Sequence, residues 1–439
     1  MLNFGNRAEP FVDSYLIETM EDVSFRLTKP ENLGKAIAFD KPWEELGSAG
    51  GAVLQDSKSI KLYYRGFPAN IPADENEYQT SCLAESTDGV NFTRTPINKI
   101  DYFGIKENNI VRMDTFCHNY CPFYDTNPDC PEDERYKAIA GIPVLGGLHV
   151  FVSPDGLNWR DPVGKAVITK GDFDSMNTAF WDPSAGLYRC YCRIFHKTPR
   201  VGIRAIQSCV STDFIHWSTP VENIYEDGIS DELYTNATRP MPGAEHVLLS
   251  IPMRFKNSRI IGEGNPKGSM GVSDAVLMTS RDGLHWDRTA HEPWLSGSLY
   301  SHEWTQRCFI TAPGVAVVDN NWIFYVSKNY MWDDHGIWAY SVPKLRLMSL
   351  FADDRGGRVT TKLLHFEQDF IHLNFSTSAY GSVRVKVIDE DGNLKFESDE
   401  LFGNEISRRI HFYGLENTVG RIVLELCDAN VYAIGSSME

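Results

Sequence analysis

The sequence predicts an all-β fold, a five-bladed β-propeller followed by a C-terminal β-sandwich. Three observations support this prediction: a turn motif recurs four times, five pairs of strand-like segments are interleaved with it, and apolar and polar residues alternate near the C-terminus. At 439 residues the chain is long enough for two or three domains. We expect the propeller to span residues 1–364 and the sandwich to span residues 365–439.

The recurring turn motif is Ser-x-Asp, mostly followed by Gly, with an aromatic residue at a fixed distance. Its four copies begin at Ser86, Ser153, Ser211 and Ser280, which are 67, 58 and 69 residues apart. Asp-Gly favours the positive-φ turn that joins two antiparallel strands, and the aromatic side chain can pack back over it. We therefore interpret the four aspartates as turn residues and not as catalysts.

Pairs of short apolar segments lie between these turns. The five pairs are 48–55 with 60–65, 119–124 with 136–140, 177–181 with 187–193, 238–241 with 246–251, and 314–318 with 321–326. Helical periodicity is nearly absent from this region, so the segments are expected to be strands. A single small sheet cannot bury its own apolar face. Five such units therefore predict five blades around a common axis.

The C-terminal region shows the regular alternation of strands with one buried face. The alternating segments are 370–375, 382–388, 409–413 and 420–426, and residues 389–392 form a hairpin turn signal. This pattern favours a β-sandwich or jelly-roll that braces the propeller. A carbohydrate-binding role for this region is the alternative.

The composition excludes several classes of partner. The formal net charge is −17, which argues against nucleic acid and against an anionic membrane surface. No apolar run approaches the ~20 residues of a membrane-spanning helix. The first residues lack the pattern of a signal peptide, so we expect a cytoplasmic protein. An oligosaccharide or a small glycoside fits this charge better, and the chain can be a monomer or a homo-oligomer.

Cysteine and aromatic contents give two further expectations. The nine cysteines are an odd number without zinc-ribbon spacing, so we expect reduced, buried thiols. Aromatic residues make up 12 % of the chain. This content suits short twisted strands and, in a pocket, stacking on sugar rings.

The candidate site follows from the predicted architecture. In a propeller the inner strand of each blade lines the central channel, so the residues just ahead of these strands face the channel mouth. Each predicted blade has at least one carboxylate there, and these include Glu44, Asp114, Asp174, Glu232 and Glu303. Convergent carboxylates perturb one another's pKa values, and two carboxylates that flank a bond are the minimum for glycoside hydrolysis.

Four of these carboxylates are the catalytic candidates: Glu44, Asp174 and Glu232, with Asp114 as their rival. Asp174 is the strongest because Asn177 lies three residues further on and Arg193 lies in the paired strand. The substrate-binding candidates are Trp43, Arg65, His118, Asn177, Arg193, Tyr234, Asn236, Glu303 and Arg307.

Several longer stretches carry a family resemblance. They are Phe11–Glu18, Lys41–Glu44, Asp174–Pro183, Ser273–Gly283 and residues 374–389. With the repeated turns and the five-unit organisation, they make the chain similar to the five-bladed glycoside hydrolases related to families 32, 43 and 68, within a bacterial branch. The resemblance covers nearly the whole chain. It implies a furanosidase-like or fructan-active hydrolase with three acidic residues, which serve as base or nucleophile, transition-state stabiliser and acid.

The expected function is therefore acid/base hydrolysis of a glycosidic bond in a neutral oligosaccharide, such as an arabinofuranoside or a fructoside. A first alternative is a glycoside phosphorylase, which needs one carboxylic acid and a cationic cluster that holds phosphate. Such a cluster could consist of Arg65, Arg193, Arg239 and Arg307. A second alternative is a carbohydrate-binding propeller without catalytic activity.

No cofactor is expected. Some related propellers hold a calcium ion in the channel, and a structural calcium ion is therefore the alternative. Asp114 and His118 could reach a metal, but the sequence has no dense loop of oxygen ligands.

Overall fold

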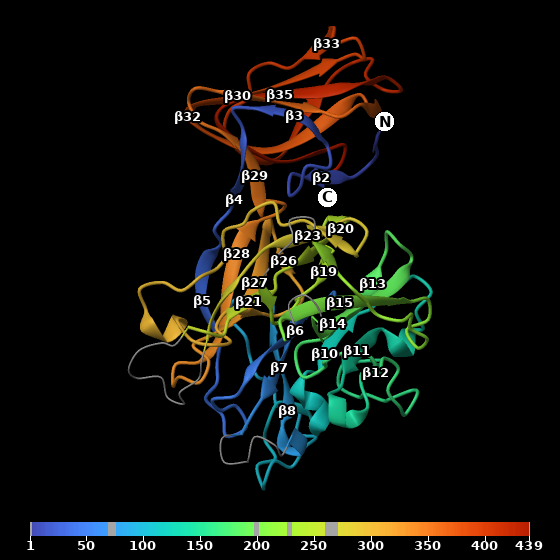
Figure 1. The fold of residues 1–439 in the computed structure, drawn as a ribbon, viewed down its shortest axis with the longest axis vertical. Coiled ribbons are helices and arrows are strands. Elements are labelled where there is room, and N and C mark those ends of the chain that lie inside the picture. The colour runs from blue at the N-terminus through green and yellow to red at the C-terminus, as the bar shows by residue number, and fades with distance from the viewer. Residues whose placement is uncertain (1, 69–75, 197–201, 226–230, 260–270, 439) are drawn as a thin grey trace.

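The computed structural model describes residues 2–68, 76–196, 202–225, 231–259 and 271–438. These residues form 35 β-strands and five short 3₁₀ turns, and they contain no α-helix. Within the same ranges, no helix has the length and hydropathy needed to cross a membrane. The chain forms two bodies stacked along its long axis, with both termini in the upper, smaller one (Figure 1).

The upper body is an eleven-stranded sheet that combines the two ends of the chain. Its N-terminal strands are β1 (Leu2–Phe4), β2 (Ala8–Pro10), β3 (Ile17–Glu21) and β4 (Ser24–Leu27). Its C-terminal strands are β29 (Met348–Ala352), β30 (Gly357–Thr361), β31 (Leu364–Phe366), β32 (Phe370–Ile388), β33 (Leu394–Glu397), β34 (Asn404–His411) and β35 (Val419–Gly435). Each N-terminal strand pairs with a C-terminal one: β1 with β31, β2 with β35, β3 with β30 and β4 with β29.

The predicted boundary after residue 364 falls inside this sheet. Strands β29 and β30 precede the boundary and pair with β35, which follows it. Buried side chains from both ends of the chain, among them Phe4, Phe11 and Leu373, share one apolar core. Alternation along the sequence identifies strands but not their partners, and for this reason the N-terminal contribution to the sheet was not predicted.

The lower body contains five sheets that follow one another along the chain. The first has β6 (Ala49–Gln55), β7 (Ile60–Gly66), β8 (Thr80–Ser86) and β9 (Ile110–Met113), and the second has β10 (Cys121–Tyr124), β11 (Tyr136–Ala140) and β12 (His149–Ser153). The third has β13 (Thr178–Asp182), β14 (Leu187–Phe195), β15 (Arg204–Ser211) and β16 (Val221–Glu222), and the fourth has β19 (Arg239–Met241), β20 (Ala244–Ser250) and β23 (Met278–Ser280). The fifth has β25 (Ile310–Thr311), β26 (Ala316–Val318), β27 (Asn321–Lys328), β28 (Gly336–Pro343) and β5 (Glu31–Ala38).

Smaller elements complete the lower body. Two small sheets consist of β17 (Ile224–Tyr225) with β24 (His285–Trp286), and of β18 (Glu232–Leu233), β21 (Met253–Lys256) and β22 (Val272–Ala275). The 3₁₀ turns are η1 (Asn76–Tyr78), η2 (Thr115–His118), η3 (Glu132–Glu134), η4 (Pro143–Leu145) and η5 (Ser301–Glu303).

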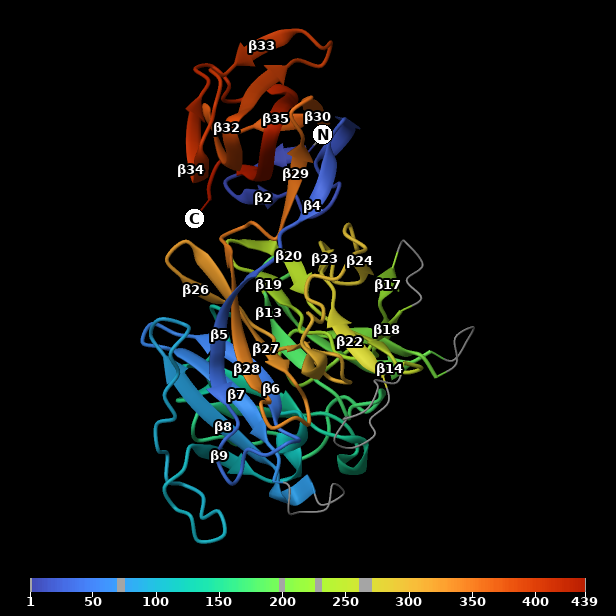
Figure 2. The same ribbon diagram turned by 90° about the vertical axis from the view of Figure 1, so that its left-hand side faces the viewer.

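The five predicted strand pairs are confirmed as antiparallel pairs. They are β6 with β7, β10 with β11, β13 with β14, β19 with β20, and β26 with β27. The fifth sheet also takes its outer strand, β5, from near the N-terminus, and β5 runs beside β28 (Figure 2). This last pairing was not predicted. All nine cysteines are free and eight of them are buried, as predicted.

The four Ser-x-Asp motifs are turns, as predicted. In each copy the serine hydroxyl donates to the aspartate carboxylate, and the carboxylate accepts a backbone N–H two residues further on. The residue after the aspartate has a positive φ in every copy. It is a glycine in three copies, whereas Phe214 adopts a φ of 68° in the third. The four carboxylates thus accept local backbone hydrogen bonds that stabilise the turns.

Three tyrosines connect neighbouring sheets through the glycines of these turns. The hydroxyl of Tyr63 donates to the carbonyl of Gly156 at 2.8 Å, and that of Tyr191 donates to Gly283 at 2.8 Å. Tyr325 of the fifth sheet donates to Gly89 at the end of the first sheet at 2.7 Å. A buried phenol needs such a partner. The first and fifth sheets are therefore joined directly, although they are far apart in the sequence.

Candidate functional site

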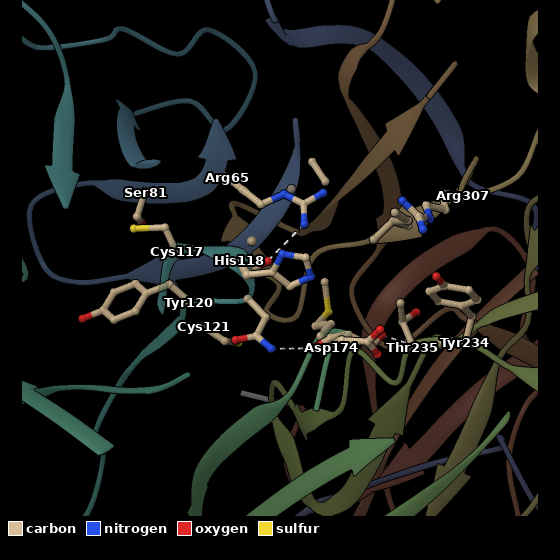
Figure 3. A pocket seen from close by; sticks show the side chains of 17 residues that line it. Arg65, Ser81, Cys117, His118, Tyr120, Cys121, Asp174, Tyr234, Thr235 and Arg307 are labelled. Atoms are coloured by element: carbon tan, nitrogen blue, oxygen red, sulfur yellow. Dashed lines mark hydrogen bonds between the residues drawn. The ribbon is translucent and has the colours of Figure 1, made fainter. Parts of the chain in front are cut away.

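A cavity of about 160 Å³ lies where the first strands of the five sheets begin (Figure 3). Its wall includes the start of β6, the end of η2 with the start of β10, and the start of β25. The segments ahead of β13 and β19 complete the wall. The segments that precede the first strands therefore meet at one cavity.

Cationic side chains outnumber anionic ones in the lining of this cavity. Arg65 and Arg307 line it, together with His118 and Tyr234. Asp174 is the only carboxylate among the described lining residues. A cavity of this composition favours an anionic ligand or an anionic reaction partner.

Guanidinium groups surround the ring of Tyr234. The guanidinium carbon of Arg204 lies 4.7 Å from the ring centre, that of Arg193 lies 5.4 Å away and that of Arg307 lies 5.8 Å away. The negative face of an aromatic ring attracts cations, so this ring partly offsets the repulsion among the three arginines. The strands β14 and β15 and the loop ahead of β25 supply these arginines.

Several buried nitrogen atoms around this cavity have no hydrogen-bond partner within the described part of the chain. They are Nδ1 of His118 and the Nε atoms of Arg65, Arg193, Arg204 and Arg307. The terminal nitrogens of Arg65 donate to the carbonyls of His118 and Gly47, at 3.1 and 2.7 Å, which fixes its guanidinium. Buried polar groups without a partner are costly. An oxyanion with several acceptor atoms would satisfy such a set of donors.

The same charges shift two pKa values. Burial alone raises the pKa of the Tyr234 phenol, but Arg307, Arg193 and Arg204 outweigh this effect and the net shift is downward. Burial lowers the pKa of His118 to about 3, with added repulsion from Arg65, Arg307 and Arg193. His118 is therefore neutral at neutral pH, and each of its ring nitrogens can donate or accept according to its tautomer.

Asp174 reaches both the cavity and the solvent. Its side chain is 59 % exposed and forms an ion pair with Arg193 of β14. Asn177 is fully buried and donates to the carbonyls of Phe173 and Ser175, at 3.0 and 2.9 Å. Ser175 in turn donates to the carbonyl of Tyr234 at 2.8 Å. Asn177 thus positions the loop that carries Asp174, and it does not line the cavity itself.

Glu44 and Trp43 do not line the cavity. The Glu44 carboxylate is 1 % exposed and accepts hydrogen bonds from Tyr64 at 2.5 Å and from two Arg94 nitrogens at 2.9 and 2.7 Å. Trp43 is buried in the core, where its indole N–H donates to Asn109 at 3.1 Å. Both residues have structural partners that the sequence did not reveal.

Asp114, Glu303 and Asn236 also lie outside the cavity lining. Asp114 begins η2, where it accepts from the backbone N–H of Phe116 at 2.9 Å and from Arg112 at 2.6 Å. Glu303 is buried and paired with Lys328. Asn236 is buried, accepts from the hydroxyl of Thr178 at 2.7 Å and donates to the carbonyl of Met176 at 3.1 Å. These three residues stabilise turns and loops.

Glu232 is connected to the cavity through an arginine. It belongs to the short strand β18, is 7 % exposed and forms an ion pair with Arg204 at 2.5 Å. Because Arg204 lies over the Tyr234 ring, Glu232 is one side chain removed from the site. Arg239, by contrast, is buried and donates to the carbonyl of Thr238 and the thiol of Cys121.

Two residues of the site were missed by sequence reasoning. Arg204 opens β15, opposite Phe195 of β14, and only this pairing brings it to Tyr234. Tyr330 follows β27, and its hydroxyl accepts from Arg307 at 2.9 Å. Neither residue precedes a first strand or ends a predicted strand pair, and these were the positions that supplied the other candidates.

The described residues contain no group of three or more His, Cys, Asp or Glu side chains that could hold a metal ion. Asp114 and His118 lie at opposite ends of η2. Asp114 faces Arg112, and His118 faces the cavity.

Comparisons with known proteins give a likeness of fold. No protein-family model and no curated protein matches the chain. A solved structure described as a glycoside hydrolase is 11 % identical over 72 % of this chain and 92 % of its own, with a TM-score of 0.50. A glycoside hydrolase family 43 arabinoxylan arabinofuranohydrolase from Bacillus subtilis is 11 % identical over 92 % of this chain and 99 % of its own, with a TM-score of 0.43.

A β-1,2-mannobiose phosphorylase from Listeria innocua is 13 % identical over 73 % of this chain and 97 % of its own, with a TM-score of 0.45. The predicted resemblance to glycoside hydrolase propellers is therefore confirmed as a resemblance in fold.

Proposed function

We propose that the protein cleaves a glycosidic bond by phosphorolysis, with Asp174 as the proton donor and the arginines of the cavity as the phosphate site. One observation carries this proposal: a single carboxylate in the described lining faces a set of buried guanidinium and imidazole nitrogens that have no partner among the described residues. Two-carboxylate hydrolysis needs a second acidic group in the same space, whereas phosphorolysis needs one acid and a cationic cluster.

In this mechanism Asp174 protonates the glycosidic oxygen as the bond to the anomeric carbon breaks. Positive charge develops on the sugar ring, and a phosphate oxygen attacks the anomeric carbon. Arg65, Arg193 and Arg307 hold the phosphate, and the negative charge of the phosphate beside Asp174 favours the protonated carboxyl that a proton donor needs. The products are a sugar phosphate and a sugar with a free hydroxyl, which has taken up the proton. A neutral oligosaccharide is the proposed substrate.

The proposal includes the architecture that brings these groups together. The five sheets of the lower body are proposed to be the five blades of a propeller, with β6, β10, β13, β19 and β25 as inner strands. The eleven-stranded upper body is proposed to be a sandwich that braces it. In this arrangement the cavity is the mouth of the central channel.

Hydrolysis by Asp174 and Glu232 is the second candidate function. A specific observation favours it: Asp174 is paired with Arg193, Glu232 is paired with Arg204, and both guanidinium groups lie over the ring of Tyr234. Each of the two carboxylates is thus connected to the same ring through one arginine. In this mechanism a water molecule or Glu232 itself takes the place of phosphate.

Turnover with and without phosphate distinguishes the two functions. Purified protein would be incubated with aryl furanosides, aryl pyranosides and neutral oligosaccharides, with inorganic phosphate or with sulfate as the ionic control. Phosphorolysis predicts sugar phosphate only in the phosphate samples, loss of this product in Asp174→Asn, and retention of activity in Glu232→Gln. Free sugar in both samples, lost in both variants, would instead support hydrolysis. The absence of any product from every substrate in the panel would contradict both proposed functions.

A further inference from the structure

Four aromatic residues, two of them exposed and two partly buried, lie in the loops that also carry Arg307 and Tyr330. These residues, Tyr300, His302, Trp304 and Trp332, are called the aromatic ledge. Tyr300 and Trp304 remain 46 % and 42 % exposed. The His302 ring stacks on Trp332 with 3.7 Å between ring centres and an interplanar angle of 11°. Aromatic rings that contact one another at the surface, as those of Tyr300, His302 and Trp332 do, often mark a binding surface.

Polar contacts hold the ledge in one arrangement. Asp334 accepts from the hydroxyl of Tyr300 at 2.8 Å and from Asn329 at 2.8 Å, and it pairs with His302 at 2.9 Å. The indole N–H of Trp304 donates to the carbonyl of Ser298 at 2.7 Å. A surface fixed in this way loses little conformational entropy when a ligand binds.

The ledge and the cavity are connected by two loops. Trp304 and Arg307 lie in the same loop ahead of β25, and Tyr330 and Trp332 lie in the same loop after β27. The two loops are connected by the hydrogen bond from Arg307 to Tyr330 at 2.9 Å. A second, open hollow of about 580 Å³ lies between residues 39–46 and residues 332–335, with Trp332 in its wall.

The small size of the cavity indicates that the cavity and the ledge have different functions. Its volume of about 160 Å³ is below the roughly 300–1,000 Å³ of pockets that enclose a drug-sized ligand. The cavity therefore has room for the reacting groups but not for a whole oligosaccharide. The sugar units that continue from the cleaved bond must lie outside the cavity, against the surface next to it.

We propose that the aromatic ledge is a saccharide-binding subsite, which holds the part of a neutral oligosaccharide substrate that extends beyond the cavity. The apolar faces of sugar rings stack on Trp304 and Tyr300, and the sugar hydroxyls remain in water or bond the polar groups around the ledge. This inference rests on the proposed function and specifies its substrate. The substrate is an oligosaccharide of several units, and affinity rises with its length.

The test measures binding of neutral oligosaccharides of one to five units, by calorimetry and by the change in tryptophan fluorescence, in the absence of phosphate. We expect Kd to fall with chain length. Trp304→Ala should weaken tetrasaccharide binding about three- to tenfold more than monosaccharide binding, the effect expected for loss of one aromatic contact. Trp304→Phe should restore most of the affinity. Tyr413→Ala is the control, because Tyr413 is 84 % exposed and lies in the upper body.

Three outcomes would overturn the inference: affinity that does not depend on chain length, equal effects of Trp304→Ala on short and long sugars, or no binding by any member of the panel. Because binding is measured without turnover, the result is separate from the test of phosphorolysis. Length-dependent binding lost in Trp304→Ala, without any phosphate-dependent product, would retain the subsite and reject the proposed reaction.

Discussion

The guanidinium carbon of Arg204 lies 4.7 Å from the centre of the Tyr234 ring, although Arg204 opens β15 and Tyr234 lies in the segment between β18 and β19. Arg193 and Arg307 approach the same ring. Three cations around one phenol, two of them paired with the carboxylates of Asp174 and Glu232, leave a local excess of positive charge inside a protein with a net charge of −17. The first three predictions concern this local reversal of charge.

Substitution of an arginine that lines the cavity should weaken phosphate binding. In Arg307→Gln, one charge-assisted interaction with the anion is lost, which corresponds to about 1.5–3 kcal/mol or roughly 10- to 100-fold in affinity. The measurement is the KM for phosphate in the glycosidase assay, or phosphate Kd by calorimetry. Arg355→Gln is the matched control, since Arg355 is exposed on the upper body. An equal response of both variants would show that the cavity does not hold phosphate.

The lowered pKa of Tyr234 should make the free energy of unfolding depend on pH in the alkaline range. An acid whose folded pKa lies below its unfolded value contributes stability above the unfolded value, here 10.0, and this contribution is lost as pH falls through the folded value. The advantage of the wild type over Tyr234→Phe in unfolding free energy should therefore increase between pH 7 and pH 10. Urea denaturation at several pH values measures it, and a constant difference would contradict the assignment.

His118 should remain neutral well below the pH at which an ordinary histidine is protonated. Burial and three neighbouring arginines lower its pKa to about 3 from the usual 6.5. The unfolded chain binds this proton and the folded chain does not, so this residue makes stability decrease as pH falls below 6.5. Nitrogen chemical shifts of the imidazole report its protonation directly. A titration of His118 near pH 6.5 would show that neither burial nor the arginines lower its pKa.

Glu44→Gln should destabilise the protein with little effect on catalysis. The substitution leaves Arg94 without its buried anionic partner, a change that costs about 3 kcal/mol in similar ion pairs. Because Glu44 is 1 % exposed and is not in the cavity wall, kcat/KM should change less than twofold. Urea denaturation and the glycosidase assay provide the two readouts. A large loss of activity with unchanged stability would return Glu44 to the catalytic candidates.

Tyr325→Phe should weaken the contact between the fifth and first sheets. The hydroxyl of Tyr325 donates to the carbonyl of Gly89, and its loss leaves this acceptor buried without a partner, at a cost of about 1–2 kcal/mol. Tyr413→Phe removes an exposed hydroxyl and should change the unfolding free energy by no more than about 0.5 kcal/mol. Thermal unfolding of the two variants compares them, and equal melting temperatures would exclude the structural role of Tyr325.

The turns and the five strand pairs could be predicted because their signals are local. Asp88 and Gly89 lie within one turn, and the hydrogen bonds that they need are supplied by residues two or three positions away. The pairing of β5 with β28, and of β1 with β31, joins residues about 300 or more positions apart. No periodicity in the sequence carries information about such partners.

The residues of the site could be predicted only in part, because some of them reach the cavity through local signals and others through strand pairing. Asp174, Arg65, His118, Tyr234 and Arg307 meet at the cavity because they precede or end the strands that the repeats reveal. Arg204 reaches the same place only through the pairing of β14 with β15.

The sequence by itself determined the five strand pairs, the four Ser-x-Asp turns and which loops face the same end of the sheets, since period-two patterning and Asp-Gly turns depend on neighbouring residues. Only the tertiary structure decided which carboxylate reaches the cavity. Glu44 and Asp174 both precede a first strand, but Arg94 and Tyr64 enclose Glu44, whereas Asp174 remains 59 % exposed beside Arg193. Burial and charge pairing depend on residues distant in sequence, and these two effects determine whether a carboxylate is structural or available for chemistry.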